Sequence, residues 1–483
     1  MKKKSIVENL SLNLLKTIMC IIFPLVTYPY AARVLGETGL GKVSFAESII
    51  GYFSVFSVLG INTYGIRELS KVRDDKRKLN DLTNQLFSIS MINTVFIYAI
   101  LIISIFKISY LYEYRWIMLI QSIMIICTNI GMDWFFTALE EYRYITIRAI
   151  MFQAISFFLL LIFVKQQEDY LQYAAVCVFA TAGSGVMNFI YIRKFVNIKF
   201  VIKQTMLKHL KPIWYIFGTN LATSIYLDLD RTMLGIWHGD AAVGLYAAAS
   251  KITKTASTIL SCITNVMLPR VSYSLKNESH ENSTKLILDT FNYTLMLVIP
   301  MSGGIICLYN EIIQIMFGIA FIGAGKALAI LSVDVVISSI NRVLAWVILV
   351  PHGYENKVLI TTTIGAVSNL VMNFMLIPRC GIEGAAVATC ISEITVMLVC
   401  IFYCKKIINI YDLFKNFYQY VIPTIMLMLL WGLLISKIRF LLARILLQIF
   451  LAVLIYGVSM VIFKNSYCNI IIDWIRKRIG EKK

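Results

Sequence analysis

Residues 226–253 read "YLDLDRTMLGIWHGDAAVGLYAAASKIT" and place charged side chains between two long apolar segments. Asp228, Asp230, Arg231 and Lys251 are the charged residues in question. An ionisable group near the centre of a bilayer costs about 2.5–3.5 kcal/mol on insertion scales, so such groups usually face a cavity and serve a function. This stretch therefore indicates a membrane protein that holds charge in its interior.

The composition of the whole chain supports a membrane protein. Of its 483 residues, 59% are hydrophobic and only 15% are charged, whereas soluble domains are about 25% charged. Apolar runs recur from end to end and do not alternate with polar residues as in a β-barrel. The first run lacks a small-residue cleavage site and is expected to remain in the mature protein. We predict an all-α polytopic membrane protein with about fourteen transmembrane helices, at 11–32, 43–62, 84–106, 116–138, 147–164, 171–192, 212–236, 243–267, 290–309, 326–349, 358–377, 384–403, 418–435 and 441–463.

The net charge of +18 follows the predicted topology. Lys and Arg concentrate in the loops on the N-terminal side of the membrane, which predicts that both termini are cytoplasmic. The excess charge thus indicates topology and attraction to anionic lipid, and it excludes a nucleic-acid patch. The ten cysteines and four histidines show no metal or disulfide spacing, so neither a metal nor a cofactor is expected. After the last span, Ile471, Ile472, Ile475 and Ile479 share one face, which indicates a helix on the inner membrane surface or a solvated tail.

The chain contains an internal repeat. The stretch "LGETGLGKVSFAESI" (35–49) resembles "LGIWHGDAAVGLYAAASKI" (234–252), and six predicted spans separate the two. An even number of spans predicts a parallel repeat about an axis along the membrane normal. The predicted lobes are 1–211 and 212–410, followed by 411–483 with the last two spans and a basic cytoplasmic tail. With gaps allowed, the alignment pairs Arg33 with Arg231, Leu35-Gly36 with Leu234-Gly235, Gly41 with Gly244, and Ile49 with Ile252.

Several charged residues lie deep in predicted spans. Lys251 and Lys254 are three apart and share a helix face. Lys254 lies near the midplane, where its ammonium cannot easily reach water, so the pair is expected to line a cavity or to pair with an acid such as Asp228. Asp228 and Arg231 are also three apart, which fits either an internal ion pair or a cation or proton site.

A second polar pattern lies on the predicted span 326–349. Asp334, Ser338, Asn341 and Arg342 form a stripe on an otherwise apolar helix, which lines a cavity or packs on a polar neighbour. Asp133 and Arg148 lie near span ends, where snorkelling or capping is expected. If the basic residues meet, their site suits a phosphate-bearing anion. The predicted substrate-binding residues are Arg33, Arg231, Lys251, Lys254 and Arg342, and the ion-coupling candidates are Glu47, Asp228, Asp230 and Asp334.

Four motifs carry a family resemblance. They are "YPYAARVLGETGLGKVSFAESI" (28–49), "GINTYGIRELS" (60–70), "DWFFTALEEYRYI" (133–145) and "IPRCGIEGAAVATCISE" (377–393). In this order they resemble the Wzx-type polysaccharide flippases of the MOP superfamily, which also holds the MATE exporters and the lipid II flippases. The resemblance implies two six-helix lobes that form a MATE-like V around a central cavity, with two further C-terminal helices.

The resemblance also implies a function that is not enzymatic. Such a protein moves undecaprenyl-pyrophosphate-linked oligosaccharide from the inner to the outer leaflet of the bacterial cytoplasmic membrane by alternating access, for surface polysaccharide biosynthesis. H⁺ or Na⁺ is the expected coupling ion, and a polysaccharide polymerase and glycosyltransferases are expected partners, with membrane lipids around the protein.

Three alternatives remain. A MATE-type drug/cation antiporter would favour an acidic or aromatic cavity. A membrane polysaccharide polymerase or acyltransferase would need a catalytic constellation at the membrane face. The two-lobe repeat disfavours a channel or scaffold.

Overall fold

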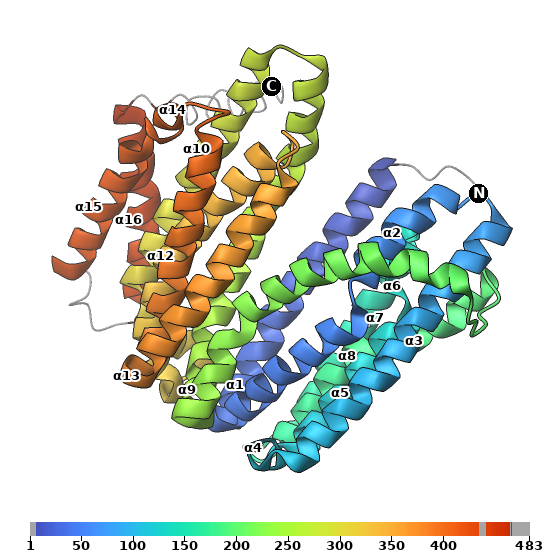
Figure 1. Ribbon diagram of the computed structural model, residues 1–483. Helices are drawn as coiled ribbons and strands as arrows, with labels where there is room; N and C mark the ends of the chain where they lie inside the picture. The colour runs from blue at the N-terminus through green and yellow to red at the C-terminus, as the bar shows by residue number, and fades with distance from the viewer. Residues whose placement is uncertain (1–5, 434–440, 464, 466–483) are drawn as a thin grey trace, which may run out of the picture. The chain divides into compact units, whose positions relative to one another are not determined.

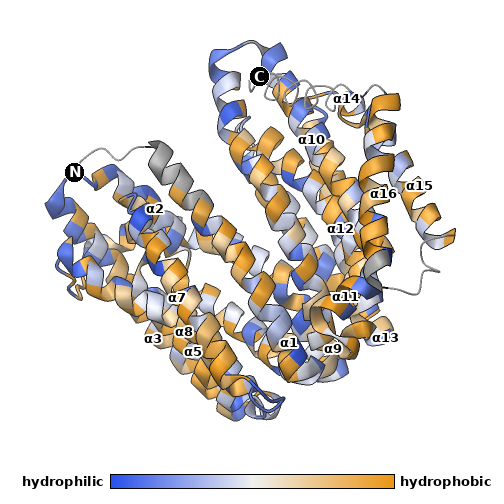
Figure 2. Ribbon diagram, turned by 180° about the vertical axis from the view of Figure 1, so that it is seen from behind, coloured by the Kyte–Doolittle hydropathy of each residue, from blue (hydrophilic) through white to orange (hydrophobic). Residues whose placement is uncertain are grey.

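The computed structural model describes residues 6–433, 441–463 and 465, and its regular elements are all helices (Figure 1). Hydrophobic residues dominate the middle of these helices, and hydrophilic residues gather towards their ends (Figure 2). The amphipathic helix predicted after the last span lies outside the described residues. An all-helical architecture is therefore confirmed for the part of the chain that is described.

The helices follow one another with short connections. The first eight are α1 (Ile6–Val58), α2 (Ile61–Val72), α3 (Lys76–Lys107), α4 (Ser109–Tyr112), α5 (Arg115–Gly131), α6 (Asp133–Ala138), α7 (Tyr142–Phe163) and α8 (Tyr170–Tyr191). The remaining α-helices are α9 (Leu207–Asn277), α10 (His280–Cys307), α11 (Tyr309–Phe317), α12 (Gly325–Arg342), α13 (Glu355–Cys404), α14 (Ile410–Phe414), α15 (Phe417–Leu433) and α16 (Leu441–Ile462). Short 3₁₀ turns flank the 192–206 segment and α12, and a π-helical turn at Val343–Leu349 continues α12.

Ten helical segments within the described residues are long and apolar enough to cross a membrane. Two of them, Leu15–Val72 and Glu355–Cys404, have 58 and 50 residues, and a membrane span needs only about twenty. The protein is therefore an integral multi-pass membrane protein. The other eight segments are Lys76–Lys107, Arg115–Ala138, Tyr142–Phe163, Tyr170–Lys194, Glu281–Cys307, Ile319–Leu349, Ile410–Leu433 and Arg444–Ile462.

Three long helices, α1, α9 and α13, each contain one residue with non-helical backbone. These residues are Gly36 (φ 67°, ψ −179°), Gly239 (φ 78°, ψ −175°) and Gly381 (φ 54°, ψ −129°). Positive φ costs glycine little because it has no Cβ. Each of these three helices covers two predicted spans, and a single glycine takes the place of the loop that the sequence predicted between them.

The positions of these glycines correct the predicted repeat alignment. Gly36 and Gly239 are 203 residues apart (239 − 36), and so are Gly41 and Gly244 (244 − 41). The two copies therefore align here without a gap, because the shared turn fixes the register. The predicted pairing of Arg33 with Arg231 and of Gly36 with Gly235 is wrong, since these residues are 198 (231 − 33) and 199 (235 − 36) residues apart and not 203.

The described helices pack into two compact units, 1–247 and 248–483. In unit 1 (1–247), α5 and α7 pack against α8, and α2 packs against α6. Trp134, Phe135 and Phe136 of α6 form much of its core together with Leu69 of α2 and Ile213 of α9. In unit 2 (248–483), α10 packs between α12 and α15, and α12 packs against α13.

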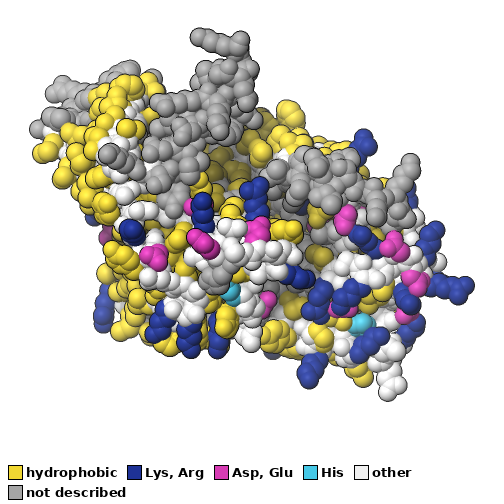
Figure 3. Space-filling view, turned by 90° about the horizontal axis from the view of Figure 1, so that it is seen from above, with side chains coloured by type: hydrophobic (Ala, Val, Ile, Leu, Met, Phe, Trp, Pro, Cys, Tyr) yellow, Lys and Arg dark blue, Asp and Glu magenta, His cyan; other side chains and the backbone are white. Residues whose placement is uncertain are grey.

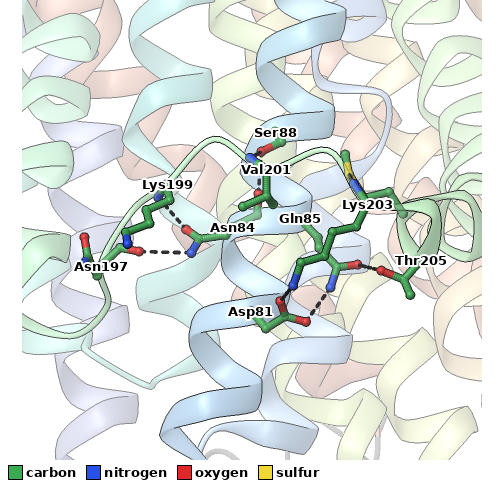
Figure 4. A network of polar contacts seen from close by, with 10 residues as sticks. Asp81, Asn84, Gln85, Ser88, Asn197, Lys199, Val201, Lys203 and Thr205 are labelled. Carbon is green, nitrogen blue, oxygen red and sulfur yellow. Dashed lines mark hydrogen bonds and ion pairs between the residues drawn. The ribbon is translucent and has the colours of Figure 1, made fainter.

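An extended segment at 192–206, the linker, joins α8 to α9 and runs along α3 within unit 1 (Figure 4). The Asn84 side chain donates to the Asn197 carbonyl (3.0 Å) and accepts from the Lys199 amide (2.9 Å), and Ser88 accepts from the Val201 amide (2.8 Å). Two residues of extended chain span about 6.6 Å, and four residues of helix rise about 6.0 Å. Helical side chains spaced by four can therefore bind alternate residues of an extended chain.

Side chains of the linker extend this contact (Figure 4). Lys203 forms an ion pair with Asp81, Gln85 donates to the other oxygen of Asp81 (2.6 Å), and Thr205 donates to Gln85 (3.1 Å). The linker is therefore attached to α3 over most of its length. Seen from above, this end of the molecule carries many Lys and Arg side chains with Asp and Glu among them (Figure 3).

Candidate functional site

The second half of α1 and the first half of α9 form an antiparallel pair inside unit 1. Ser48 lies 2.9 Å from Thr232 (Oγ to Oγ1), and a Cβ added to Gly51 would lie 3.8 Å from the Asp228 carboxylate. A Cβ at Gly235 would overlap the Phe45 ring. As residue numbers rise along α1 they fall along α9, so the two helices lie side by side over several turns.

This helix pair brings three of the predicted site residues together. One guanidinium nitrogen of Arg231 lies 3.6 Å from the Glu47 carboxylate and 3.9 Å from that of Asp228. The Arg231 side chain is 13% exposed, whereas that of Glu47 is 62% exposed. The proposed internal pairing of Asp228 with Arg231 is confirmed, and Glu47 joins it. Because both distances exceed 3.5 Å, these are ionic contacts without direct hydrogen bonds.

Tyrosine and threonine hydroxyls surround this charged group. Tyr246 donates to the buried Asp230 carboxylate (2.5 Å), and the Tyr52 and Thr232 hydroxyls lie 3.2 Å apart. Sequence reasoning missed Tyr246, Tyr52 and Thr232 because tyrosine and threonine are unremarkable in apolar spans. Only Tyr52, four residues after Ser48 on the same helix, has a spacing that could have indicated it.

Arg33 lies on α1, three residues before the Gly36 kink, and its side chain is exposed. The same end of unit 1, which we name the distal end, holds Gly36, Tyr110, Tyr114 and Gly239. There Tyr114 donates to the Asp240 carboxylate (2.7 Å) and Tyr110 donates to the Gly235 carbonyl (2.6 Å). Burial raises the pKa of the Asp240 carboxyl, against the lowering effect of the Tyr114 hydrogen bond and of Lys42.

The remaining predicted residues belong to unit 2. Lys251 is half-buried and Lys254 is exposed, both on α9. Asp334 and Arg342 are half-buried on α12. Because these residues and the Arg231 group belong to different units, the predicted convergence of all five basic residues stays a prediction.

The polar stripe of α12 packs at least partly on a polar neighbour. The buried Asn341 amide donates to both the carbonyl oxygen (2.9 Å) and the carboxylate (2.5 Å) of Glu393 on α13. Glu393 was not among the predicted site residues although it ends the "CISE" motif. Its signal was an acid within an apolar span, which is the same signal that selected Asp334.

Asp133 and Arg148 differ from the expectation of snorkelling or capping. Arg148 is 4% exposed, and its guanidinium lies 2.9 Å from Asp133 and also bonds Asn188. Asn188, which is fully buried, donates to the same Asp133 oxygen. Arg148 therefore forms a structural ion pair with Asp133, which follows the positive-φ residue Met132 (φ 44°) at the α5–α6 break and whose own side chain is 63% exposed.

Among the described residues, no group of three or more His, Cys, Asp and Glu side chains is arranged to hold a metal ion. The chemistry available at the Arg231 group is electrostatic. It combines one guanidinium with two carboxylates.

A multi-pass helical fold with charge inside its spans is typical of membrane proteins that move ions or polar substrates. The sequence profile of the family described as "Polysaccharide biosynthesis protein" matches residues 6–275. The chain belongs to this family, which consists of transporters and flippases, so the polymerase and acyltransferase alternatives are set aside.

Two relatives illustrate the family. The chain is 23% identical over 382 residues to the "Putative O-antigen transporter" of Shigella dysenteriae, which covers 78% of this chain and 94% of that protein. It is also 29% identical over 198 residues to the "Probable low-salt glycan biosynthesis flippase Agl15" of Haloferax volcanii. This match covers 40% of this chain and 41% of that protein.

Solved structures share the fold. The lipid II flippase MurJ in an inward closed conformation matches with a TM-score of 0.75 and 16% identity, over 95% of this chain and 99% of MurJ. An inward-facing MATE family multidrug resistance transporter of the MOP superfamily matches with a TM-score of 0.65 and 13% identity, over 85% of this chain and 99% of the transporter. The fold is thus of the MurJ and MATE type, as the sequence predicted.

Proposed function

We propose that this protein flips an oligosaccharide linked to undecaprenyl pyrophosphate from the inner to the outer leaflet of a bacterial cytoplasmic membrane, for surface polysaccharide biosynthesis. The observation that carries the proposal is the nearly buried arginine, Arg231, inside a helix pair of a MurJ-type fold. A guanidinium suits a diphosphate because it offers several donors in a fixed fork. The O-antigen and glycan functions in the relatives' names support a sugar-bearing substrate.

The proposed topology has fourteen spans and cytoplasmic termini. Each of the kinked helices α1, α9 and α13 contributes two spans, and α3, α5 with α6, α7, α8, α10, α12, α15 and α16 contribute one each. The α9 helix is assigned two spans because its kink at Gly239 matches the kink of α1 at Gly36. Two lobes of six spans, 1–211 and 212–410, follow from the repeat, and α15 and α16 form the C-terminal pair.

In the proposed mechanism, the pyrophosphate pairs with Arg33, Arg231, Lys251, Lys254 and Arg342 in a chamber that alternates between the two leaflets. The anion must displace Glu47 and Asp228 from Arg231, so binding frees two carboxylates. H⁺ or Na⁺ uptake at Glu47, Asp228, Asp230 or Asp334 would then reset the empty carrier. An inside-negative potential favours outward movement of an anion by about 2.3 kcal/mol per charge per 100 mV crossed.

A flipping assay in proteoliposomes with lipid-linked oligosaccharide tests this proposal. Replacing Lys251 and Lys254 by glutamine should reduce the flipping rate at least tenfold, since two charge-assisted contacts to phosphate are worth about 1.5–3 kcal/mol each. Lys326→Gln is the matched control, because Lys326 is 73% exposed and pairs with Glu383. If the protein with both lysines replaced flips the substrate as fast as the Lys326→Gln control, the cationic-chamber mechanism is refuted.

The MATE-type antiporter remains the second candidate, on the observation that a MATE transporter shares the fold. It predicts that a cationic drug dissipates a H⁺ or Na⁺ gradient in the same vesicles. The lipid-linked substrate should not compete with that drug if this candidate is right.

A further inference from the structure

The distal end of unit 1 holds a reciprocal contact between the two copies of the repeat. A Cβ built on Gly41 would overlap the carbonyl oxygen of Asp240 and lie 3.0 Å from the Gly244 nitrogen. A Cβ built on Gly244 would overlap the carbonyl oxygen of Glu37 and lie 3.1 Å from the Gly41 nitrogen. The backbones of α1 and α9 therefore touch here, and only glycine fits at either position.

The contact has the symmetry of the repeat. Gly41 corresponds to Gly244, and Glu37 corresponds to Asp240, each pair being 203 residues apart (244 − 41 and 240 − 37). Gly41 contacts Asp240, the equivalent of Glu37 in the second copy, and Gly244 contacts Glu37. Two equivalent positions contact each other in this reciprocal way only where the local symmetry axis passes between them. The contact therefore lies on the axis that relates the first two helical hairpins of the repeats.

Aromatic residues from a third segment cover this contact. The Phe45 ring fills the space that a side chain at Gly235 would occupy, and it packs against Tyr110 and Tyr114 with centroids 5.6 and 4.8 Å away. The same two tyrosines donate to Gly235 and to Asp240. The segment before α5 is thus bound to the α9 kink by two hydrogen bonds and one aromatic cluster.

Further from the distal end than the Gly41–Gly244 contact, the hydroxyls of Ser48 and Thr232 lie between α1 and α9. Ser48 is 1% exposed and lies two helical turns from Gly41, towards the Arg231 group. Any water or headgroup that passes between α1 and α9 at the distal end must first separate the glycine contact. It then reaches the level of Ser48, which contacts Thr232 beside Arg231.

We infer that the Gly41–Gly244 contact, with Tyr110 and Tyr114 as its latch, is the outer gate of the transport path and is closed in this structure. This inference rests on the proposed function, because it supposes that a headgroup leaves towards the distal end. The backbone contact leaves no room for even a methyl group between the two glycines, and two hydrogen bonds hold it without making it permanent.

The gate is tested by the accessibility of a single cysteine. Ser48→Cys is introduced into a chain whose ten native cysteines are replaced by alanine, and intact cells are treated with a membrane-impermeant maleimide. Gly41→Ala and Gly244→Ala should each raise the labelling rate about five- to hundredfold, since overpacking opposes the closed contact. Gly218→Ala on α9 is the matched control, because no atom lies within 4 Å of its added Cβ.

Tyr114→Phe provides a milder second variant, which removes the hydrogen bond to Asp240 and leaves the ring in place. It should raise labelling about three- to tenfold, the value of one hydrogen bond. Equal labelling in Gly244→Ala, Tyr114→Phe and the Gly218→Ala control, each eluting as a folded species from gel filtration, would overturn the gate. If labelling rises as expected while the parent chain flips no lipid-linked oligosaccharide, the gate stands and the proposed function fails.

Discussion

The attachment of the linker to α3 can be measured as a protease-resistant segment. Asn84 is 4% exposed and makes two hydrogen bonds to the linker backbone, one to Asn197 and one to Lys199. Asn84→Ala removes both, and each contributes about 1 kcal/mol net. The free energy needed to open the linker locally should fall by about 2 kcal/mol.

Limited trypsin digestion of the purified protein in detergent reports this free energy. Lys199 and Lys203 are exposed cleavage sites within the linker. When reclosing is faster than cleavage, the cleavage rate follows the open population. At about 1.4 kcal/mol per factor of ten, 2 kcal/mol corresponds to about thirtyfold faster cleavage.

Two comparisons make this prediction specific. Asn80 accepts a single hydrogen bond from the Asn197 amide (2.8 Å), so Asn80→Ala should speed cleavage only about fivefold. Asn277 bonds its own helix at Tyr273 and serves as the control for an exposed asparagine. Cleavage of Asn84→Ala no faster than that of Asn277→Ala would refute the reasoning that side chains of α3 hold the linker.

Three further predictions concern stability. Asp133→Asn should lower the free energy of unfolding by about 3 kcal/mol, because it leaves the buried Arg148 guanidinium without its charge partner. Arg148→Met should lower it by less, because the carboxylate that it leaves unpaired, Asp133, is 63% exposed. Equal melting temperatures of the two variants would contradict this order. Burial and Lys208 lower the pKa of His209, which bonds Tyr64 (2.7 Å). As pH falls, His209 therefore binds a proton in the unfolded chain at a higher pH than in the folded protein, and the free energy of unfolding should fall below about pH 6.5. This loss of stability should be smaller in His209→Asn. Identical pH slopes of the melting temperature in the two proteins would exclude a contribution of His209. Gly65→Ala should cost about 1–3 kcal/mol because its Cβ would lie 2.7 Å from the Trp134 ring, whereas Gly304→Ala, with open space around it, should be neutral in the same melts.

Much of the fold could be predicted from composition because each span buries its backbone hydrogen bonds within itself. Hydropathy therefore placed most helices, and the charges of 226–253 marked a genuine ionic cluster. The single-residue turns were not predictable, since a glycine in an apolar run reads the same at a kink as at a helix contact. Gly36 is a kink with positive φ and Gly41 is a helix contact, yet both are glycines within six residues of the same apolar stretch.

The site was predictable only where its parts are local in the sequence. Asp228 and Arg231 are three apart on one helix, so their pairing followed from spacing. In the contacts of Tyr246 with Asp230 and of Asn84 with the linker, at least one partner gives no sequence signal of its own, and nothing in the sequence paired Asn341 with Glu393. Such contacts depend on how helices pack, and a single sequence does not encode that in its periodicity.

The one-residue kinks at Gly36, Gly239 and Gly381 determine where foreign sequence can be inserted. One extra residue at such a point would rotate the following helix by about 100° and turn its inward residues outward. Epitope tags and fluorescent reporters are therefore excluded from these positions. The short exposed segment 165–168 between α7 and α8, which lies near Gly36, offers a place where added length leaves both helices in phase.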